Sequence, residues 1–206
     1  MNLKGANIVV YDCEIERAID GKDVTWSTFD KMGFSVGCLY DYQTDDYSVY
    51  FRDDLAELAE RLNRADLVVA FNQLGFDNKL LTELGFPVGE NPQFDMLDES
   101  RRSVGWEPGM QLPSGLKLDN HLEGTFGKSF MKTGHGEMAP IWWQEGKIGK
   151  VTSYCLADVK RERMLFEHIV YKRWVRTPVH GPRFINIDKV IKALTPNKGE
   201  PNEQSI

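Results

Sequence analysis

Apolar residues in the first fifty positions predict three β-strands. Residues 7–11 (N-I-V-V-Y) form a short apolar run rich in β-branched side chains, which is typical of a buried strand. Residues 34–42 and 47–51 have the same character, and the polar segment 43–46 (Q-T-D-D) is typical of a hairpin turn. The chain is therefore expected to open with a three-stranded antiparallel meander.

Helices that alternate with short apolar strands follow the meander. A helix is expected from Asp53, because leucines recur after it at helical spacing. Residues 66–71 and 93–97 predict buried strands, and residues 75–84 predict a helix between them. Strands linked by helices favour parallel pairing. The fold class expected is α/β, with a mixed sheet in which the antiparallel meander precedes parallel strands and helices flank the sheet.

The second half of the chain is expected to be mainly helical. Ser114 is the candidate cap of a helix that precedes residues 127–150. This irregular stretch predicts an ordered loop with a short helix. Residues 151–174 carry the longest helical pattern, with Thr152 or Ser153 as its expected cap.

The length of 206 residues suits one domain with a short appendage. We expect residues 1–176 to form that domain and residues 177–195 to pack on it as an extension. Residues 196–206 are polar and aperiodic, so disorder is expected there. The absence of a signal peptide and of an apolar run near ~18 residues predicts a cytoplasmic protein without membrane contact.

Composition narrows the function classes. The three cysteines are odd in number and lack a C-x-x-C pair, so neither a disulfide framework nor a cysteine-based zinc site is expected. The net charge of −6 alone argues against a nucleic-acid-binding protein. Its distribution is uneven, however: residues 1–100 hold 20 acids and 8 bases (net −12), and residues 101–206 hold 11 acids and 17 bases (net +6). These bases suit either solvated helix faces or a phosphate-binding wall.

Three acidic clusters lie near the ends of expected elements. Alternation along the first strand places Asp12 and Glu14 on one face, where two carboxylates repel unless a cation lies between them. Asp77 lies in the first turn of the helix that follows residues 66–71. Tyr154 and Asp158 are four apart on the long helix and therefore share a face.

The order and spacing of these clusters resemble the DEDD superfamily of 3′–5′ exonucleases, which has a ribonuclease H-like fold. The matching segments are Asp12-x-Glu14, Asn72-x-x-x-Phe76-Asp77 and Tyr154-x-x-x-Asp158. The resemblance spans about residues 7–172 and is greatest to the proofreading exonuclease domains of family B DNA polymerases. Ser153 occupies the position of the histidine in one branch of the superfamily, so the sequence resembles the tyrosine branch.

The resemblance implies hydrolysis of phosphodiester bonds with two Mg²⁺ or Mn²⁺ ions. Asp12 would bridge both ions, Glu14 and Asp158 would complete the ion that activates water, and Asp77 would hold the second ion through waters. Tyr154 would orient the attacking water, since a phenol with an ordinary pKa of ~10 is a poor base at neutral pH. The expected substrate is the 3′ end of single-stranded nucleic acid, with DNA favoured, and the product is a nucleoside 5′-monophosphate. Replication or repair proteins are the expected partners.

Substrate contacts are less specifically indicated. The candidates beside the motifs are Cys13, Ile15, Asn72 and Phe76, and those in the basic half are Lys128 and Trp142. For Trp142, packing of the loop onto the core is the favoured alternative, and for Lys128 the alternative is exposure to solvent. Asp95 is interpreted as a capping or turn residue, and His121 as part of the scaffold.

Three other functions remain open at the level of sequence, besides an unrelated metal-binding globular protein in which the motifs coincide by chance. A structure-specific or endonucleolytic enzyme of the same fold would share the acids, as would an exonuclease directed at RNA. The third is an inactive nucleic-acid-binding module, against which the intact acids argue.

Overall fold

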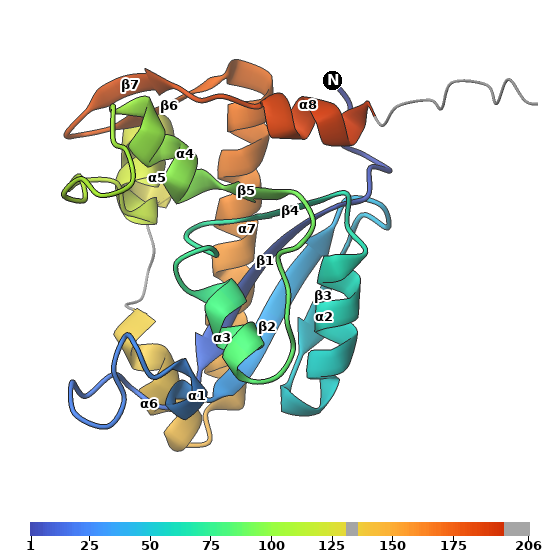
Figure 1. The fold of residues 1–206 in the computed structure, drawn as a ribbon, viewed down its shortest axis with the longest axis vertical. Helices are drawn as coiled ribbons and strands as arrows, with labels where there is room; N and C mark the ends of the chain where they lie inside the picture. The colour runs from blue at the N-terminus through green and yellow to red at the C-terminus, as the bar shows by residue number, and fades with distance from the viewer. Residues whose placement is uncertain (131–135, 196–206) are drawn as a thin grey trace, which may run out of the picture.

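A five-stranded mixed sheet forms the centre of the protein (Figure 1). The computed structural model describes residues 1–130 and 136–195, so the tail expected to be disordered lies outside the described residues. The strand order is β3-β2-β1-β4-β5, with antiparallel pairing from β1 to β3 and parallel pairing of β1 with β4 and β4 with β5. The predicted α/β mixed sheet of the ribonuclease H-like type is therefore confirmed. The strands are β1 Ile8–Ile15, β2 Phe34–Asp41, β3 Asp46–Tyr50, β4 Leu67–Ala70 and β5 Gln93–Asp95.

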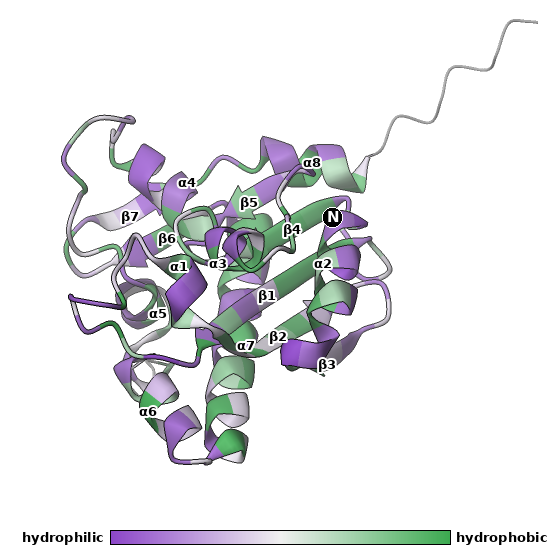
Figure 2. Ribbon diagram, turned by 60° about the horizontal axis from the view of Figure 1, so that its bottom comes forward, coloured by the Kyte–Doolittle hydropathy of each residue, from purple (hydrophilic) through white to green (hydrophobic). Residues whose placement is uncertain are grey.

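Both faces of the sheet are buried, each against its own helices. Successive side chains of a strand point to opposite faces, so Ile8 and Val10 of β1 join one apolar core while Val9 and Tyr11 join the other. The first core is completed by α7 (Ile148–Lys172), and the second by α2 (Leu55–Asn63), α3 (Asp77–Glu83) and α1 (Phe29–Met32). Figure 2 shows the hydrophobic strands β1 and β2 beside helices that carry both hydrophilic and hydrophobic turns.

The longest helix begins earlier than the sequence pattern indicates. α7 begins at Ile148, after Lys147, and neither Thr152 nor Ser153 caps it. The hydroxyl of Thr152 donates instead to the carbonyl of Ile148 at 3.0 Å, within the helix. The predicted cap is therefore wrong, because a hydroxyl can bond the preceding turn as readily as a helix terminus.

Two further elements differ from prediction. The strand expected over residues 93–97 ends at Asp95, whose side chain accepts from the amides of Leu97 and Asp98 and starts α4 (Met96–Ser103). The capping role expected of Asp95 is thereby confirmed. The helix expected from Ser114 begins only after Lys117, as α5 (Leu118–Phe126). The short segments around these helices are η1 Arg52–Asp54, η2 Lys128–Phe130, η3 Gly136–Met138 and α6 Ala139–Gln144.

The chain after α7 forms a hairpin and a last helix. The hairpin pairs β6 (Trp174–Thr177) with β7 (Gly181–Phe184) and contacts α5, whereas α8 (Asp188–Leu194) contacts β4 and β5. The division predicted after residue 176 falls inside β6 and stays a prediction. Within residues 1–130 and 136–195, every helix is too short or too polar to traverse a lipid bilayer.

Candidate metal centre

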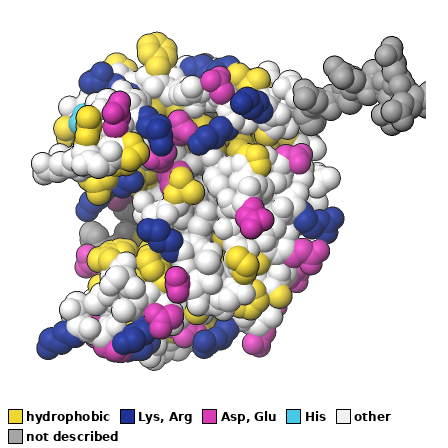
Figure 3. Space-filling view, in the orientation of Figure 1, with side chains coloured by type: hydrophobic (Ala, Val, Ile, Leu, Met, Phe, Trp, Pro, Cys, Tyr) yellow, Lys and Arg dark blue, Asp and Glu magenta, His cyan; other side chains and the backbone are white. Residues whose placement is uncertain are grey.

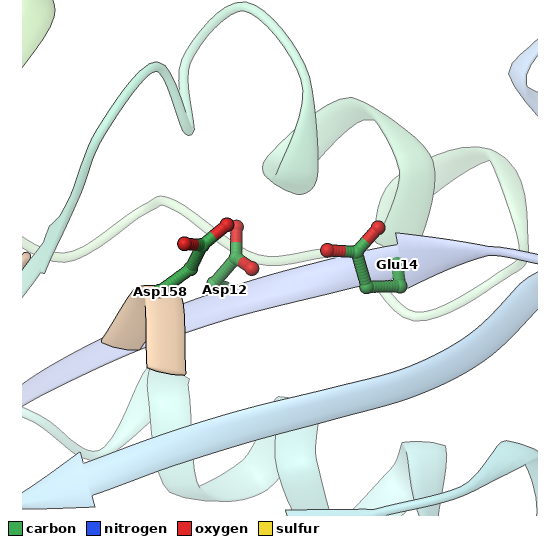
Figure 4. A group of neighbouring side chains, drawn as sticks. All are labelled: Asp12, Glu14 and Asp158. Carbon is green, nitrogen blue, oxygen red and sulfur yellow. The ribbon is translucent and has the colours of Figure 1, made fainter. Parts of the chain in front are cut away.

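Three carboxylates meet where β1 passes α7. Asp12 and Glu14 are two residues apart on β1, so both side chains leave the strand on the face that α7 covers. Asp158 lies near the middle of α7 and is 2% exposed. One oxygen atom from each side chain lies within 4.8 Å of those from the other two. Figure 4 shows the carboxylates of Asp12 and Asp158 pointing toward one another, with Glu14 farther along β1.

The environment of Asp12 favours a cation. Within the described part of the chain, its Oδ2 atom is buried and has no hydrogen-bond partner. Burial raises the pKa of the Asp12 carboxyl well above its ordinary value, and the negative charges of Glu14 and Glu162 raise it further. A cation between the carboxylates would oppose this rise, because it favours their charged form. Carboxylate oxygens suit Mg²⁺ and Mn²⁺, so these residues fit such an ion.

Glu162 is a neighbouring acid that the motifs did not include. It lies one helical turn after Asp158 and is 3% exposed. The i,i+4 spacing of the two acids on α7 was the available signal in the sequence. Arg161, between them, donates from Nη1 to Oδ1 of Asp158 at 3.1 Å. The charge around the candidate metal centre therefore depends on Glu162 and Arg161 as well as on the acids of the motifs.

Asp77 reaches the same region from the opposite side of β1. It is the first residue of α3, is 3% exposed, and accepts from the backbone amide of Cys13 at 3.0 Å through Oδ1. Its carboxylate lines the same cavity as Asp12. Among the described residues, the group of oxygens within 4.8 Å comprises the other three acids and not Asp77.

A cavity of about 570 Å³ opens beside these acids, and side chains of two chemical kinds line it. The acids in its lining include Asp12, Glu14, Asp77 and Asp158, which are joined by Tyr154 of α7. The apolar part of its lining includes Ile15, Ile19, Trp26, Phe76 and Ile141. In Figure 3, the left side of the molecule is hollowed between the part with α4 and α5 and the part with α1 and α6.

The predicted substrate contacts fall into two groups. Cys13, Ile15, Asn72 and Phe76 all line the cavity. Lys128 does not line it: its side chain is 85% exposed and lies 3.8 Å from a carboxylate oxygen of Glu123.

Trp142 lies beside the cavity rather than in its lining. It packs edge-on against Tyr154, with 6.1 Å between ring centroids. Both Trp142 and Trp143 pack partly buried against the core, which agrees with the packing alternative for these residues.

Trp26 is one of the cavity residues that sequence reasoning missed. It is 67% exposed, and its ring meets that of Phe76 edge-on at 5.9 Å between centroids. The only signal was a single aromatic within a polar segment, which carries no periodicity. Its place beside the cavity depends on its tertiary contact with Phe76, which precedes α3.

Comparison with known proteins gives a structural match only. No protein-family model and no curated protein sequence matches the chain. Among solved structures, the chain is similar to the family B DNA polymerase from the hyperthermophilic archaeon Pyrobaculum calidifontis, with a TM-score of 0.56 and 16% identity. The match covers 79% of this chain and 24% of the polymerase chain, so this chain spans about a quarter of that protein. At this identity the likeness shows the fold.

Proposed function

We propose that the protein is a divalent-metal-dependent 3′–5′ exonuclease of the tyrosine branch of the DEDD superfamily. The observation that carries the proposal is the group of Asp12, Glu14 and Asp158 oxygens within 4.8 Å of one another, on residues that line a cavity. The structural likeness of the chain to part of a DNA polymerase supports nuclease activity for this fold. The same comparison favours DNA over RNA as the substrate.

The residues have two roles in the proposed reaction: some hold the metal ions, and one orients the attacking water. Two divalent cations, when bound, would stabilise charge on the entering and leaving oxygens of the phosphodiester. Asp12 would be shared between them, Glu14 and Asp158 would complete one site, and Asp77 would serve the other. Tyr154 lines the same cavity, and its hydroxyl would hydrogen-bond and orient the attacking water.

The apolar part of the cavity lining suits the base of a 3′-terminal nucleotide. Aromatic faces bind bases with little sequence preference, and Phe76 and Trp26 provide two such rings. A base inserted there must be unpaired, which favours single-stranded ends. The structure-specific and endonucleolytic alternatives lack this requirement for a free terminus.

Labelled oligonucleotides test the proposal directly. Single-stranded DNA and RNA, labelled at either end, are incubated with Mg²⁺, Mn²⁺ or EDTA, and matched strands carry a blocked 3′ end. We expect stepwise shortening from the 3′ end, release of 5′-monophosphates, and no reaction in EDTA or on blocked strands. Equal cleavage of blocked and open strands would instead indicate an endonuclease.

A matched pair of variants ties the activity to the site. Asp12→Ala removes the acid common to both proposed ion sites, and loss of several kcal/mol of charge stabilisation lowers the rate on the order of 10³-fold. Glu60→Ala removes an exposed acid that pairs with Arg64 on the surface and serves as the control. Residual Asp12→Ala activity within tenfold of the wild-type rate would contradict the assignment.

A further inference from the structure

A second groove runs along the exposed side of α7 and includes Tyr154 in its lining. Its volume is about 390 Å³. Gly149, Ser153 and Ala157 provide small side chains along it, so the helix surface lies open to a ligand. Tyr154 lines both this groove and the acidic cavity, so the two adjoin at its side chain.

Helical periodicity places two basic side chains, Lys150 and Arg161, toward opposite ends of the groove. Lys150, Tyr154, Ala157 and Arg161 recur at i, i+4, i+7 and i+11, which is one face of a helix. At 1.5 Å per residue, Lys150 and Arg161 are about 16 Å apart along the helix axis. At ~3.4 Å per phosphate along one stacked strand, this distance spans several nucleotides.

Both charged residues that line the groove are basic, in a chain whose net charge is −6. The Nζ atom of Lys150 lies 5.9 Å from the centroid of the Trp142 ring, and this contact holds the ammonium group at the groove wall. The Arg161 guanidinium bonds Asp158, so its remaining donors adjoin the candidate metal centre. A polyanion whose end occupies the cavity matches this pattern.

We propose that the α7 groove holds the sugar–phosphate backbone of the substrate strand on the 5′ side of the terminal nucleotide. This inference rests on the proposed exonuclease function for the position of the strand end. Lys150 contacts a backbone phosphate in this arrangement, and the small side chains let the strand lie close to α7. Because phosphates carry no sequence information, the groove binds all sequences alike.

Binding without hydrolysis tests the groove apart from catalysis. A fluorescent single-stranded DNA 12-mer is titrated in EDTA, and its anisotropy is measured at several salt concentrations. Lys150→Ala is expected to weaken binding roughly three- to tenfold, the range of a partly exposed charged contact. It should also reduce the salt slope by about one. Ser153→Glu, which adds a negative charge at an exposed position, should weaken binding further.

Lys147→Ala is the matched control. Lys147 lies three residues away, outside the groove lining, and its Nζ atom is 2.6 Å from a carboxylate oxygen of Glu145. Equal loss of affinity in the Lys147 and Lys150 variants would overturn the proposal, as would unchanged binding of Lys150→Ala.

Substrate length provides the second measurement. In Mg²⁺, Lys150→Ala should raise KM for the 12-mer more than for a dinucleotide, which occupies little of the groove. Equal effects on both lengths would contradict the proposal. If the wild-type protein binds the 12-mer through Lys150 but hydrolyses neither DNA nor RNA, the exonuclease proposal fails while the groove stands. If it hydrolyses the strands and Lys150→Ala binds normally, only the groove proposal fails.

Discussion

The carboxylate of Asp95 accepts a hydrogen bond from the backbone amide of Asn72 at 3.0 Å and so joins the junction of β5 and α4 to the loop after β4. Its second oxygen accepts from the amide of Leu74 at 3.1 Å. Asn72 has a positive φ of 79°, a conformation that non-glycine residues adopt infrequently. The same carboxylate caps α4, so one buried side chain fixes both the start of that helix and the loop that leads to Asp77.

Replacing Asp95 is therefore expected to affect both stability and activity. Asp95→Ala loses a helix cap and leaves the Asn72 and Leu74 amides unpaired, which costs roughly 2–4 kcal/mol. Displacement of Asp77 lowers activity about 10- to 100-fold, as for other residues that orient ligands. Denaturant unfolding and the Mg²⁺ concentration for half-maximal rate measure the two effects.

Two comparisons distinguish positioning from a general loss of stability. Asp95→Asn keeps one acceptor oxygen and should recover part of the activity and of the Mg²⁺ affinity. Asp98→Ala, in the first turn of the same helix, removes an acid that pairs with Arg102. If Asp98→Ala shifts the Mg²⁺ requirement as much as Asp95→Ala, the loop contact is not the cause.

Asp12→Asn is expected to stabilise the metal-free protein while abolishing hydrolysis. The folded-state pKa of Asp12 is raised, so its contribution to stability is present at low pH and is lost as pH rises through that pKa. A neutral amide avoids that loss at pH 7. A gain on the order of 1 kcal/mol corresponds to about 2–4 °C in Tm for a protein of this size.

Adding Mg²⁺ or Mn²⁺ should make the wild-type protein more stable than the Asp12→Asn variant, which reverses their order in the metal-free state. Ions that bind only the folded state raise the Tm of the wild-type protein, and Asp12→Asn should lose most of that rise. Thermal melts with and without metal measure both effects. A metal-free variant less stable than the wild-type protein would contradict the repulsion argument.

The sequence identified the acids of the site better than it identified their surroundings. Alternation along β1 placed Asp12 and Glu14 on one face, and helical spacing placed Tyr154 and Asp158 together. Which helix covers that face of β1 is a contact between segments over 100 residues apart, and local periodicity does not encode it. Only the motif resemblance indicated that the helix with Tyr154 and Asp158 lies beside the strand with Asp12 and Glu14.

The residues that sequence reasoning missed owe their roles to tertiary contacts. Glu162 follows Asp158 at helical spacing, but only packing makes it a buried charge near Asp12. Trp26 lies in a segment without periodicity and enters the cavity through its contact with Phe76. The cap role of Asp95 was predictable from residue type, whereas its bonds to the loop at 72–74 were not.

Tyr154→Phe is expected to lower kcat without weakening metal binding. The phenol lines the cavity, and its ring packs against Trp142 at 6.1 Å, so phenylalanine retains the packing and loses only the hydroxyl. Misplacement of the attacking water costs on the order of 10²-fold. Single-turnover rates measure the loss, and the metal-induced rise in Tm should match that of the wild-type protein. A variant with the wild-type rate would exclude a role for the hydroxyl in orienting water.

His121 is expected to make the folding stability depend on pH. It is fully buried, and its ring nitrogens lie 3.0 Å from the Lys117 carbonyl oxygen and 2.9 Å from Oγ of Ser100. Burial lowers the pKa of the imidazole to about 4. The unfolded chain, with a histidine pKa near ~6.5, binds the proton more readily, so stability is complete above that value and falls as pH decreases toward 4. Between pH 7 and pH 5 this linkage lowers the free energy of unfolding by about 2 kcal/mol.

Denaturant unfolding at both pH values should show that His121→Gln loses less stability than the wild-type protein over this interval, whatever its stability at pH 7. Equal losses in the two proteins would show that His121 does not cause the pH dependence.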